Sequence, residues 1–141
     1  QFGFDGAADN PHLPHNYSRD LVAYTGTHDN DTTVGWSRRL DPEHTARVQL
    51  YLAAGGDNVP EHMMRACLGS VAQLAVIPLQ DLLLLDSDAR FNTPGTQSES
   101  NWSWRLPDGS LTAPLAARYR SWNEVFGRLC APGGLPARMP V

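Results

Sequence analysis

The stretch YTGTHDNDTTVGW, residues 24–36, marks a predicted junction between a strand and a helix. The apolar run LVAY at residues 21–24 leads into it and has the pattern of a buried strand. Residues 32–40 follow with apolar side chains at helical spacing, and Gly26 lets the chain turn between the two elements. The polar run HDND at 28–31 therefore lies at the carboxyl end of a strand, which is where barrel enzymes hold their chemistry.

Strand and helix signals alternate along the rest of the chain, and this alternation predicts an α/β fold with parallel strands. Asp41 and Pro42 are the predicted N-cap and first residue of a helix over residues 42–54. A third helix is expected to begin near Pro60, with an apolar stripe at 3.6-residue spacing. That stripe consists of Met63, Met64, Cys67, Leu68, Val71 and Leu74. The other expected elements are the end of a strand at 1–4, a loop over 5–20, a strand over 75–78, an irregular segment over 86–107 and a helix over 113–129.

Composition excludes several classes of partner. The chain of 141 residues is 41% hydrophobic and 18% charged, which is typical of a globular protein with one core. Its net charge of -4 and its lack of a Lys- or Arg-rich run exclude nucleic acid as an expected partner. No window has the roughly 20 apolar residues of a membrane span, so no membrane partner is expected. Cys67 and Cys130 lack a CxxC spacing, and two reduced thiols are expected rather than a disulfide.

Sequence blocks on both sides of the junction occur in one collinear order. They are QFGFDG and NPHLPHNY within residues 1–17, THDND at 27–31, VIPLQDLL at 76–83, and FNTPG followed by NWSWR within 91–105. With these blocks the chain resembles the carboxyl-terminal part of the 4-α-glucanotransferases, also called amylomaltases or disproportionating enzymes. The resemblance implies a cytoplasmic enzyme of starch and glycogen metabolism that needs no cofactor. It also implies that residues 1–141 form one partial catalytic domain, the closing portion of a (β/α)8 TIM barrel. Gly133, Gly134 and the prolines near them predict a frayed tail at 131–141.

The resemblance further implies an activity and assigns residues to it. Enzymes of this family transfer α-1,4-glucan segments to glucose or maltooligosaccharide acceptors by a retaining mechanism, which uses a nucleophilic and an acid/base carboxyl group. In the family both groups lie upstream of the QFGFDG block, so neither is assigned here and the isolated chain is expected to be inactive. Asp29 matches the third carboxylate, which stabilises the transition state, and His28 and Asn92 match sugar-binding residues. Asp5, at the expected end of the first strand, is a further candidate for a sugar contact.

Five other polar residues are expected to position the residues of the site rather than to contact the sugar directly. They are Asn30, Gln80, Asp81, His15 and Asn101. Two of them have a second interpretation, because Asp81 is placed to cap a helix start and His15 to organise its own loop. The HDND run has such an alternative as well: Asp31 is placed to cap the helix that begins at Thr32.

Metal-binding interpretations fit these residues poorly. A calcium loop that begins at Asp29 would need a bidentate glutamate where Leu40 stands. A zinc site made from His12, His15 and His28 has no nearby cysteine to complete a tetrahedral set of ligands. A structural or sugar-facing role is therefore expected for the loop that carries His12 and His15, and no metal is expected.

The four tryptophans divide between the core and the site. Trp36 and Trp122 are expected in the core. Trp102 and Trp104 follow the NTPG turn, where an indole face could stack on a sugar ring or be buried with its N–H paired. A place in the core is expected for at least one of this pair.

Two other functions stay open on sequence grounds. The isolated chain could be a non-catalytic fragment that binds glucan, or its parent could be a glycoside hydrolase of the α-amylase clan, because the sequence does not separate water from sugar as the acceptor. A partial barrel would also expose strand edges and an apolar inner face, so the chain is expected to self-associate through those edges.

Overall fold

The computed structural model describes residues 1–129 and divides the chain into two compact units. The first unit is Gln1–Pro107 and contains every candidate site residue, and the second begins at Asp108. The tail predicted at 131–141 and Cys130 lie outside the described residues. Cys67 is buried on helix α3 (Val59–Leu68), where the sequence placed it on the apolar stripe.

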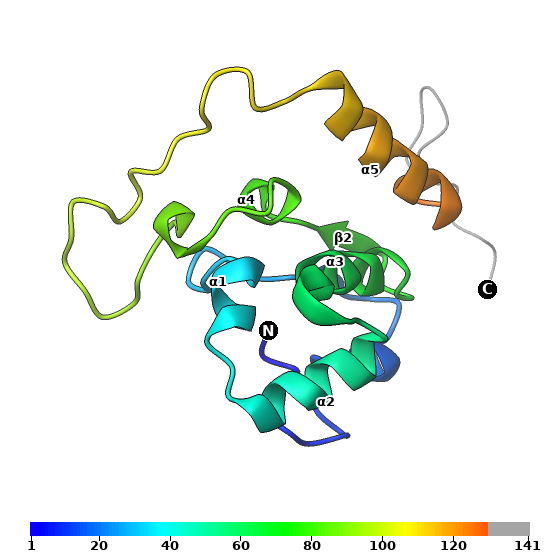
Figure 1. Cartoon of the computed structure of the whole chain (residues 1–141). Coiled ribbons are helices and arrows are strands. Elements are labelled where there is room, and N and C mark those ends of the chain that lie inside the picture. The colour runs from blue at the N-terminus through cyan, green and yellow to red at the C-terminus, as the bar shows by residue number, and fades with distance from the viewer. Residues whose placement is uncertain (130–141) are drawn as a thin grey trace. The chain divides into compact units, whose positions relative to one another are not determined.

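Two parallel strands form the sheet of the first unit, and Figure 1 shows β2 beside α3. Strand β1 (Val22–Tyr24) pairs with β2 (Leu74–Val76) in a register that aligns Ala23 with Ala75. Ala23 is buried in one cluster with Cys67 of α3, so this face of the sheet is covered. Because side chains alternate along a strand, the intervening residues lie on the other face. These residues, which are 38–54% exposed, are Val22, Tyr24, Leu74 and Val76.

Three helices build the main core of this unit. Helix α3 packs against both α1 (Thr33–Arg38) and α2 (Pro42–Leu52). Helix α2 begins as predicted, because the Asp41 carboxylate accepts a hydrogen bond from the His44 N–H at 2.9 Å and Pro42 needs no N–H at this position. The core cluster consists of Val48, Leu52, Val59 and Met63, and the half-buried Phe4 and Trp36 pack against it.

Short helices complete the first unit. They are η1 (Pro14–Asn16), η2 (Gly56–Asn58), α4 (Leu79–Leu82) and η3 (Ser87–Ala89). The segment predicted to be irregular over 86–107 contains only the short η3, and residues 90–107 have no helix or strand. The candidate site residues near Asn92 are therefore positioned by side-chain and turn hydrogen bonds rather than by regular structure.

The amino-terminal residues and the end of α3 differ from the prediction. Residues 1–4 do not form a strand, because the Phe4 N–H donates to the Gln1 carbonyl at 3.2 Å and closes a turn. Helix α3 ends at Leu68 with Gly69 at its C-cap, so Val71 and Leu74 do not extend the apolar stripe and are 57% and 54% exposed.

The strand predicted over 75–78 is shifted. It spans Leu74–Val76, and Pro78, which has no N–H to donate to a sheet, instead precedes α4 as its N-cap residue. The polar residues Gln80 and Asp81 consequently lie inside α4, one turn beyond the strand rather than at its end.

Helix α5 (Ala113–Val125) belongs to the second unit. It begins where the Thr112 hydroxyl accepts a hydrogen bond from the Leu115 N–H at 3.3 Å. None of its residues is buried: Trp122, expected in the core, is half-buried against Tyr119, and Val125 is 75% exposed. Within residues 1–129, no helix has both the length and the apolar character needed to cross a membrane.

Candidate functional site

A buried carboxylate holds the strand-to-helix junction together. Asp81 is 2% exposed and accepts hydrogen bonds from the Thr25 hydroxyl at 2.5 Å and the Thr33 N–H at 2.8 Å. Thr25 directly follows β1 and Thr33 opens α1, so one side chain of α4 connects both ends of the junction. Burial is the largest influence on this carboxyl and raises its pKa, against the opposing effect of the two hydrogen bonds. Asp81 therefore supports the junction and does not cap its own helix.

Asp31 has a different role from the predicted helix cap. The N-cap of α1 is Thr32, whose hydroxyl accepts from the Gly35 N–H at 3.1 Å. The Asp31 carboxylate is buried and accepts a hydrogen bond from the Ser87 hydroxyl at 2.8 Å, and it also pairs with Arg39. Gly35 permits this approach, since a Cβ there would lie 2.1 Å from the Ser87 hydroxyl.

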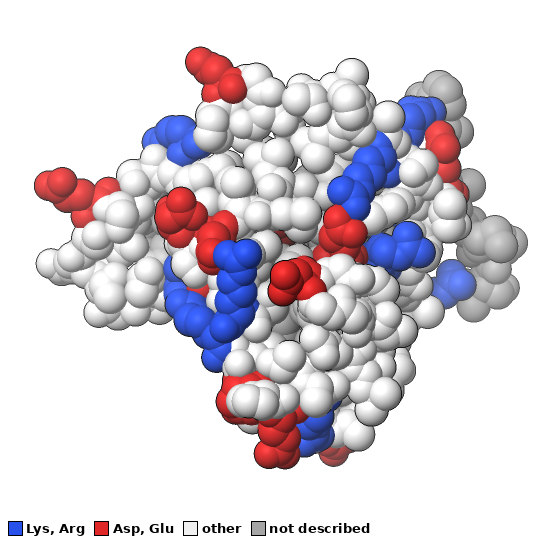
Figure 2. Space-filling model, in the orientation of Figure 1, with Lys and Arg blue, Asp and Glu red and all other residues white. Residues whose placement is uncertain are grey.

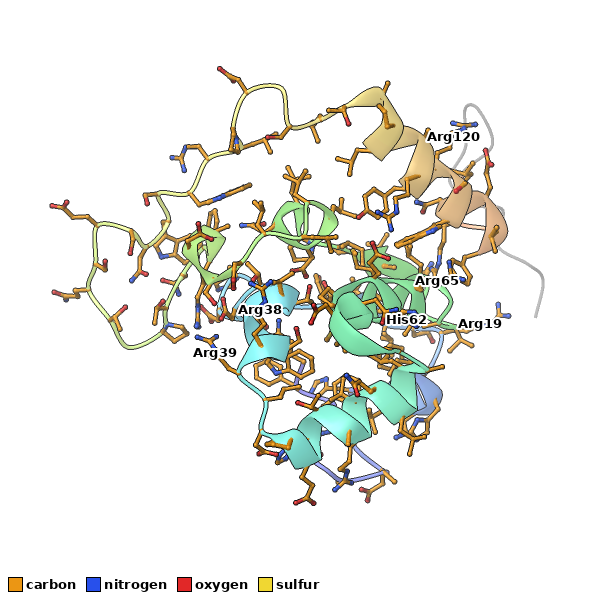
Figure 3. All side chains as sticks on the ribbon, in the orientation of Figure 1. Arg19, Arg38, Arg39, His62, Arg65 and Arg120 are labelled. Carbon is orange, nitrogen blue, oxygen red and sulfur yellow. The ribbon has the colours of Figure 1, made fainter. Side chains whose placement is uncertain are left out.

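Two neighbouring arginines at the end of α1 form ion pairs with separate segments. Figure 3 labels both: Arg38 pairs with Asp86, just before η3, and Arg39 pairs with Asp31. On the face seen in Figure 2, acidic and basic side chains are interspersed. The Arg38–Asp86 ion pair connects α1 to the segment of η3, and the chain that follows η3 carries Asn92 and Asn101.

The structure brings three of the predicted sugar-binding and catalytic residues together. The Asp29 Oδ1 accepts a hydrogen bond from the Asn92 amide at 2.7 Å, although the two residues are 63 positions apart. The His28 Nε2 lies 3.4 Å from the same oxygen. The side chains of His28 and Asp29 are 55% and 47% exposed, so this cluster faces solvent. We refer to His28, Asp29 and Asn92 as the Asp29 cluster.

Arg90 connects the two segments of the Asp29 cluster, and no motif in the sequence pointed to it. One guanidinium nitrogen donates to the Asp29 carbonyl at 2.8 Å, and its Nε donates to the Asn92 carbonyl at 2.8 Å. The fork geometry of arginine suits this task, because one planar group can bind two carbonyls at once. The only sequence signal was its position, two residues before Asn92 at the start of the FNTPG block.

Two of the expected supporting residues shape the loops of the Asp29 cluster. The Asn30 amide oxygen accepts from the Thr27 N–H at 2.8 Å and from its hydroxyl at 3.0 Å, which closes the turn that carries His28 and Asp29. Gly26 is needed there for close packing: a Cβ on it would lie 3.1 Å from the Cβ of Asn30.

Asn101 shapes the second loop in the same way. Its amide oxygen accepts from the Thr93 N–H at 3.0 Å, and its amide nitrogen donates to the Thr96 carbonyl at 3.1 Å. The loop over residues 93–101 is therefore tied across its base by one asparagine side chain. This loop begins immediately after Asn92, so Asn101 supports the cluster through the backbone.

Other candidates make contacts that do not include the Asp29 cluster. Asp5 is exposed and accepts from the Ala7 N–H at 2.9 Å, an interaction that holds the pKa of its carboxyl below the usual value. His15 contacts the Tyr51 hydroxyl at 2.9 Å and the Ala8 carbonyl at 2.9 Å, which organises its own loop against α2. Gln80 is half-buried and lines a small hollow together with Asp81.

The site is an open surface rather than a closed pocket. The hollow beneath it, between residues 26–32 and 78–91, has a volume of about 20 Å³, which is room for about one water molecule. A larger hollow of about 590 Å³ lies between α1, α2, η2 and α3, and none of the predicted site residues lines it. Among the described residues, no group of three or more His, Cys, Asp and Glu side chains is arranged to hold a metal ion.

The Asp29 cluster offers both acceptors and donors to a ligand. An ionised carboxylate accepts hydrogen bonds, an amide does both, and a neutral imidazole has one donor and one acceptor nitrogen. Neighbouring hydroxyls of one sugar ring can use this combination. A carboxylate at this place would also offset a positive charge that develops on a bound ligand during reaction.

Comparison with known proteins identifies the family to which the chain is similar. The profile of the 4-alpha-glucanotransferase family matches residues 1–112. The 4-alpha-glucanotransferase of Thermus thermophilus is 47% identical over 137 residues, which cover 92% of this chain and 27% of that protein. The chloroplastic/amyloplastic 4-alpha-glucanotransferase of Arabidopsis thaliana is 46% identical over 133 residues, which cover 92% of this chain and 23% of that protein.

A solved structure agrees with the sequence comparisons. An amylomaltase from Streptococcus agalactiae, in complex with acarbose, superposes with a TM-score of 0.84 at 32% identity, and the match covers 90% of this chain and 26% of that one. The chain thus spans about a quarter of the length of the relatives that it matches. From the profile match, the identities and the shared fold, we conclude that this chain belongs to the 4-alpha-glucanotransferase family.

Proposed function

We propose that this chain supplies the sugar-binding and charge-stabilising part of the active site of a 4-alpha-glucanotransferase. The enzyme would transfer α-1,4-glucan segments to glucose or maltooligosaccharide acceptors. The observation that carries the proposal is the exposed Asp29 carboxylate, held by Asn92 beside His28, in a chain of this family. The activity of the whole protein is itself part of the proposal, because the chain spans about a quarter of its relatives.

Asp29 is proposed to stabilise the transition state of a retaining reaction. In such a reaction a nucleophilic carboxylate forms a covalent glycosyl intermediate, a second carboxyl group acts as acid and base, and positive charge develops at the anomeric carbon. Both of those groups are proposed to come from parts of the enzyme outside this chain. Asp29 would offset the charge at the anomeric carbon, and an acceptor hydroxyl in place of water would release the glucan as a transfer product.

The chain is proposed to form the closing portion of a (β/α)8 barrel. Its two strands are parallel, and the candidate residues follow the carboxyl ends of both, as barrel enzymes arrange their sites. The exposed apolar face of the sheet would then be the inner surface of the barrel, since barrel interiors are filled by such side chains. That exposed face also supports the expectation that the isolated chain self-associates.

Polar support for the site is proposed to come from Asp81, Arg90, Asn30 and Asn101, through the hydrogen bonds described above. A sugar contact for Asp5 stays a prediction. It was inferred from a strand end at residues 1–4, and no strand forms there. His15 has a structural explanation in its contacts with Tyr51 and Ala8.

Titration of acarbose into the isotope-labelled chain tests the proposal by nuclear magnetic resonance. The signals of the Asp29 cluster are expected to shift, and Asp29→Asn is expected to weaken binding about tenfold, because a hydrogen bond to a charged group contributes about 1.5–3 kcal/mol. Asp9→Asn removes another exposed carboxylate and is the matched control, with affinity unchanged. Acarbose that leaves all three cluster residues unperturbed would refute the proposed site.

The reaction itself is tested with maltotriose. In the full-length enzyme two maltotriose molecules should yield glucose and maltopentaose, and Asp29→Asn should abolish this conversion. The isolated chain should form neither product, because the nucleophile and the acid/base are proposed to lie elsewhere. Glucose and maltose from the full-length enzyme would instead show hydrolysis, as in the wider α-amylase clan, and would refute the transfer function.

A further inference from the structure

Trp102 has a backbone conformation unlike that of the other tryptophans. Its φ of 65° lies in the left-handed region, which costs a residue other than glycine about 1–3 kcal/mol unless its surroundings hold it there. The Trp102 N–H donates to the Phe91 carbonyl at 2.8 Å, and its own carbonyl accepts from the Arg105 guanidinium at 3.2 Å. The loop therefore maintains a strained residue directly beside the candidate site.

The indole ring of Trp102 is fixed by two aromatic neighbours. Its centroid lies 5.1 Å from that of the His28 ring at an interplanar angle of 37°. Phe91 meets it edge-on, with centroids 5.0 Å apart and an angle of 87°. The residue is nevertheless 53% exposed, so it is not a core residue. An indole ring that is held in place and left half exposed offers a ligand an apolar face beside a polar N–H, the combination that makes tryptophan common at binding interfaces.

We propose that Trp102 is an aromatic platform on which a glucose unit of the glucan stacks. The C–H groups on one face of a glucopyranose ring are apolar and pack on an aromatic face, while the hydroxyls at its rim reach polar groups. This inference rests on the proposed function, and it adds a second binding element of a different chemical kind to the Asp29 cluster.

His28 connects the two binding elements. Its Nε2 lies 3.4 Å from the Asp29 carboxylate, and its ring is also the nearest aromatic neighbour of Trp102 apart from Phe91. A glucan that binds to both the Asp29 carboxylate and the Trp102 ring would therefore pass over the His28 side chain between them. One unit would bind through its hydroxyls at Asp29, and the apolar face of a unit would cover the exposed part of Trp102.

Trp104 provides a contrast within the same NWSWR block. It is half-buried, and its backbone is not left-handed. Trp102 combines its left-handed backbone with a ring contact to His28 and a 53% exposed side chain, whereas Trp104 is more buried. The proposal therefore predicts that the two tryptophans differ in their effect on glucan binding.

Three variants of the chain test this prediction by resonance titration with acarbose and with maltotriose. Trp102→Asn removes the ring but keeps a residue that adopts the left-handed region readily, and it should weaken binding about tenfold. Trp102→Phe keeps an aromatic face, and its affinity for the ligand should fall about threefold or less. Trp104→Phe is the matched control and should bind like the unaltered chain. Thermal melting of each variant separates lost binding from lost folding.

The outcomes distinguish this inference from the proposed function. If ligand shifts the Asp29 cluster but leaves the Trp102 indole N–H signal in place, and Trp102→Asn binds with full affinity, the platform is wrong and the proposed function stands. If ligand shifts neither element, both are overturned. A loss in Trp102→Asn that Trp102→Phe largely restores, with the signals of Asp29 and Asn92 still responding, supports the platform.

Discussion

Asp81 of α4, which binds the strand-to-helix junction, and Asp29 within that junction have contrasting surroundings. Asp81 is 2% exposed, and its two oxygens accept hydrogen bonds from Thr25 and Thr33. The Asp29 side chain is 47% exposed, and its Oδ1 is the oxygen that Asn92 and His28 approach. The buried carboxylate uses its acceptors to join backbone segments, whereas the exposed one keeps acceptor capacity for a ligand. Burial therefore separates a structural carboxylate from the one proposed to bind a ligand, where residue type cannot.

The contrast has a physical basis in desolvation. A buried hydrogen-bonding group that loses its partner lowers the free energy of unfolding by about 1–3 kcal/mol, because water cannot reach the group to replace the lost hydrogen bond. An exposed carboxylate loses little when a protein partner is removed, since water replaces it. Changes at Asp81 should thus act on folding, and changes at the Asp29 cluster on binding.

The largest expected effect is the loss of stability in Asp81→Ala. The Thr25 hydroxyl and the Thr33 N–H would both lose their acceptor in a buried place, which should lower the free energy of unfolding by about 3 kcal/mol. Asp29→Ala is the matched control and should change it by about 0.5 kcal/mol or less. Denaturation in urea measures the free energy of unfolding of both variants and of the unaltered chain. Equal losses in the two variants would break the contrast between the aspartates.

An intermediate effect is expected for Arg90→Ala. Arg90 binds the carbonyls of Asp29 and Asn92, so its removal should loosen the cluster and weaken acarbose binding about fivefold, corresponding to roughly 1 kcal/mol. Arg19→Ala removes an arginine that lies at the periphery in Figure 3 and should leave affinity unchanged. Unaltered binding in Arg90→Ala would show that the cluster holds its geometry without the guanidinium.

The smallest expected effect concerns the pH dependence of stability. Burial raises the pKa of Asp81 above its value of 3.8 in the unfolded chain, so the folded state binds this proton more tightly. The resulting stabilisation is complete below the unfolded pKa and is lost as the pH rises through the folded pKa. The free energy of unfolding should therefore fall as the pH rises from about 4 to neutrality, and this fall should be smaller in Asp81→Asn, which has no carboxyl group to titrate at that position.

Denaturation of the chain and of Asp81→Asn at a series of pH values measures this difference. The asparagine oxygen can still accept from the Thr33 N–H, so the junction should stay formed. Asp41 and Asp86 have lowered pKa values and contribute stability that is lost on acidification, but both are present in each protein and cancel in the comparison. Parallel profiles would contradict a raised pKa for Asp81.

Local sequence signals predicted the elements and the motifs well. Asp41 and Pro42 placed the start of α2, the apolar run at 21–24 placed β1, and THDND with FNTPG named the residues that the structure brings together. The wrong predictions for Asp31 and for residues 1–4 depended on tertiary partners that a local pattern does not contain. Asp31 looked like a cap because Ser87 and Arg39 could not be seen beside it, and residues 1–4 looked like a strand without a sheet to join.

The sequence by itself determined the family, the parallel α/β pattern and the residue types available at the junction. Only the tertiary structure decided which of them are joined and which are exposed. Asp29 meets Asn92 across 63 positions, and Asp81 meets Thr33 across 48, through hydrogen bonds that no spacing pattern encodes. Desolvation then assigns the roles, because it depends on how many atoms surround a group, and only the folded chain sets that number.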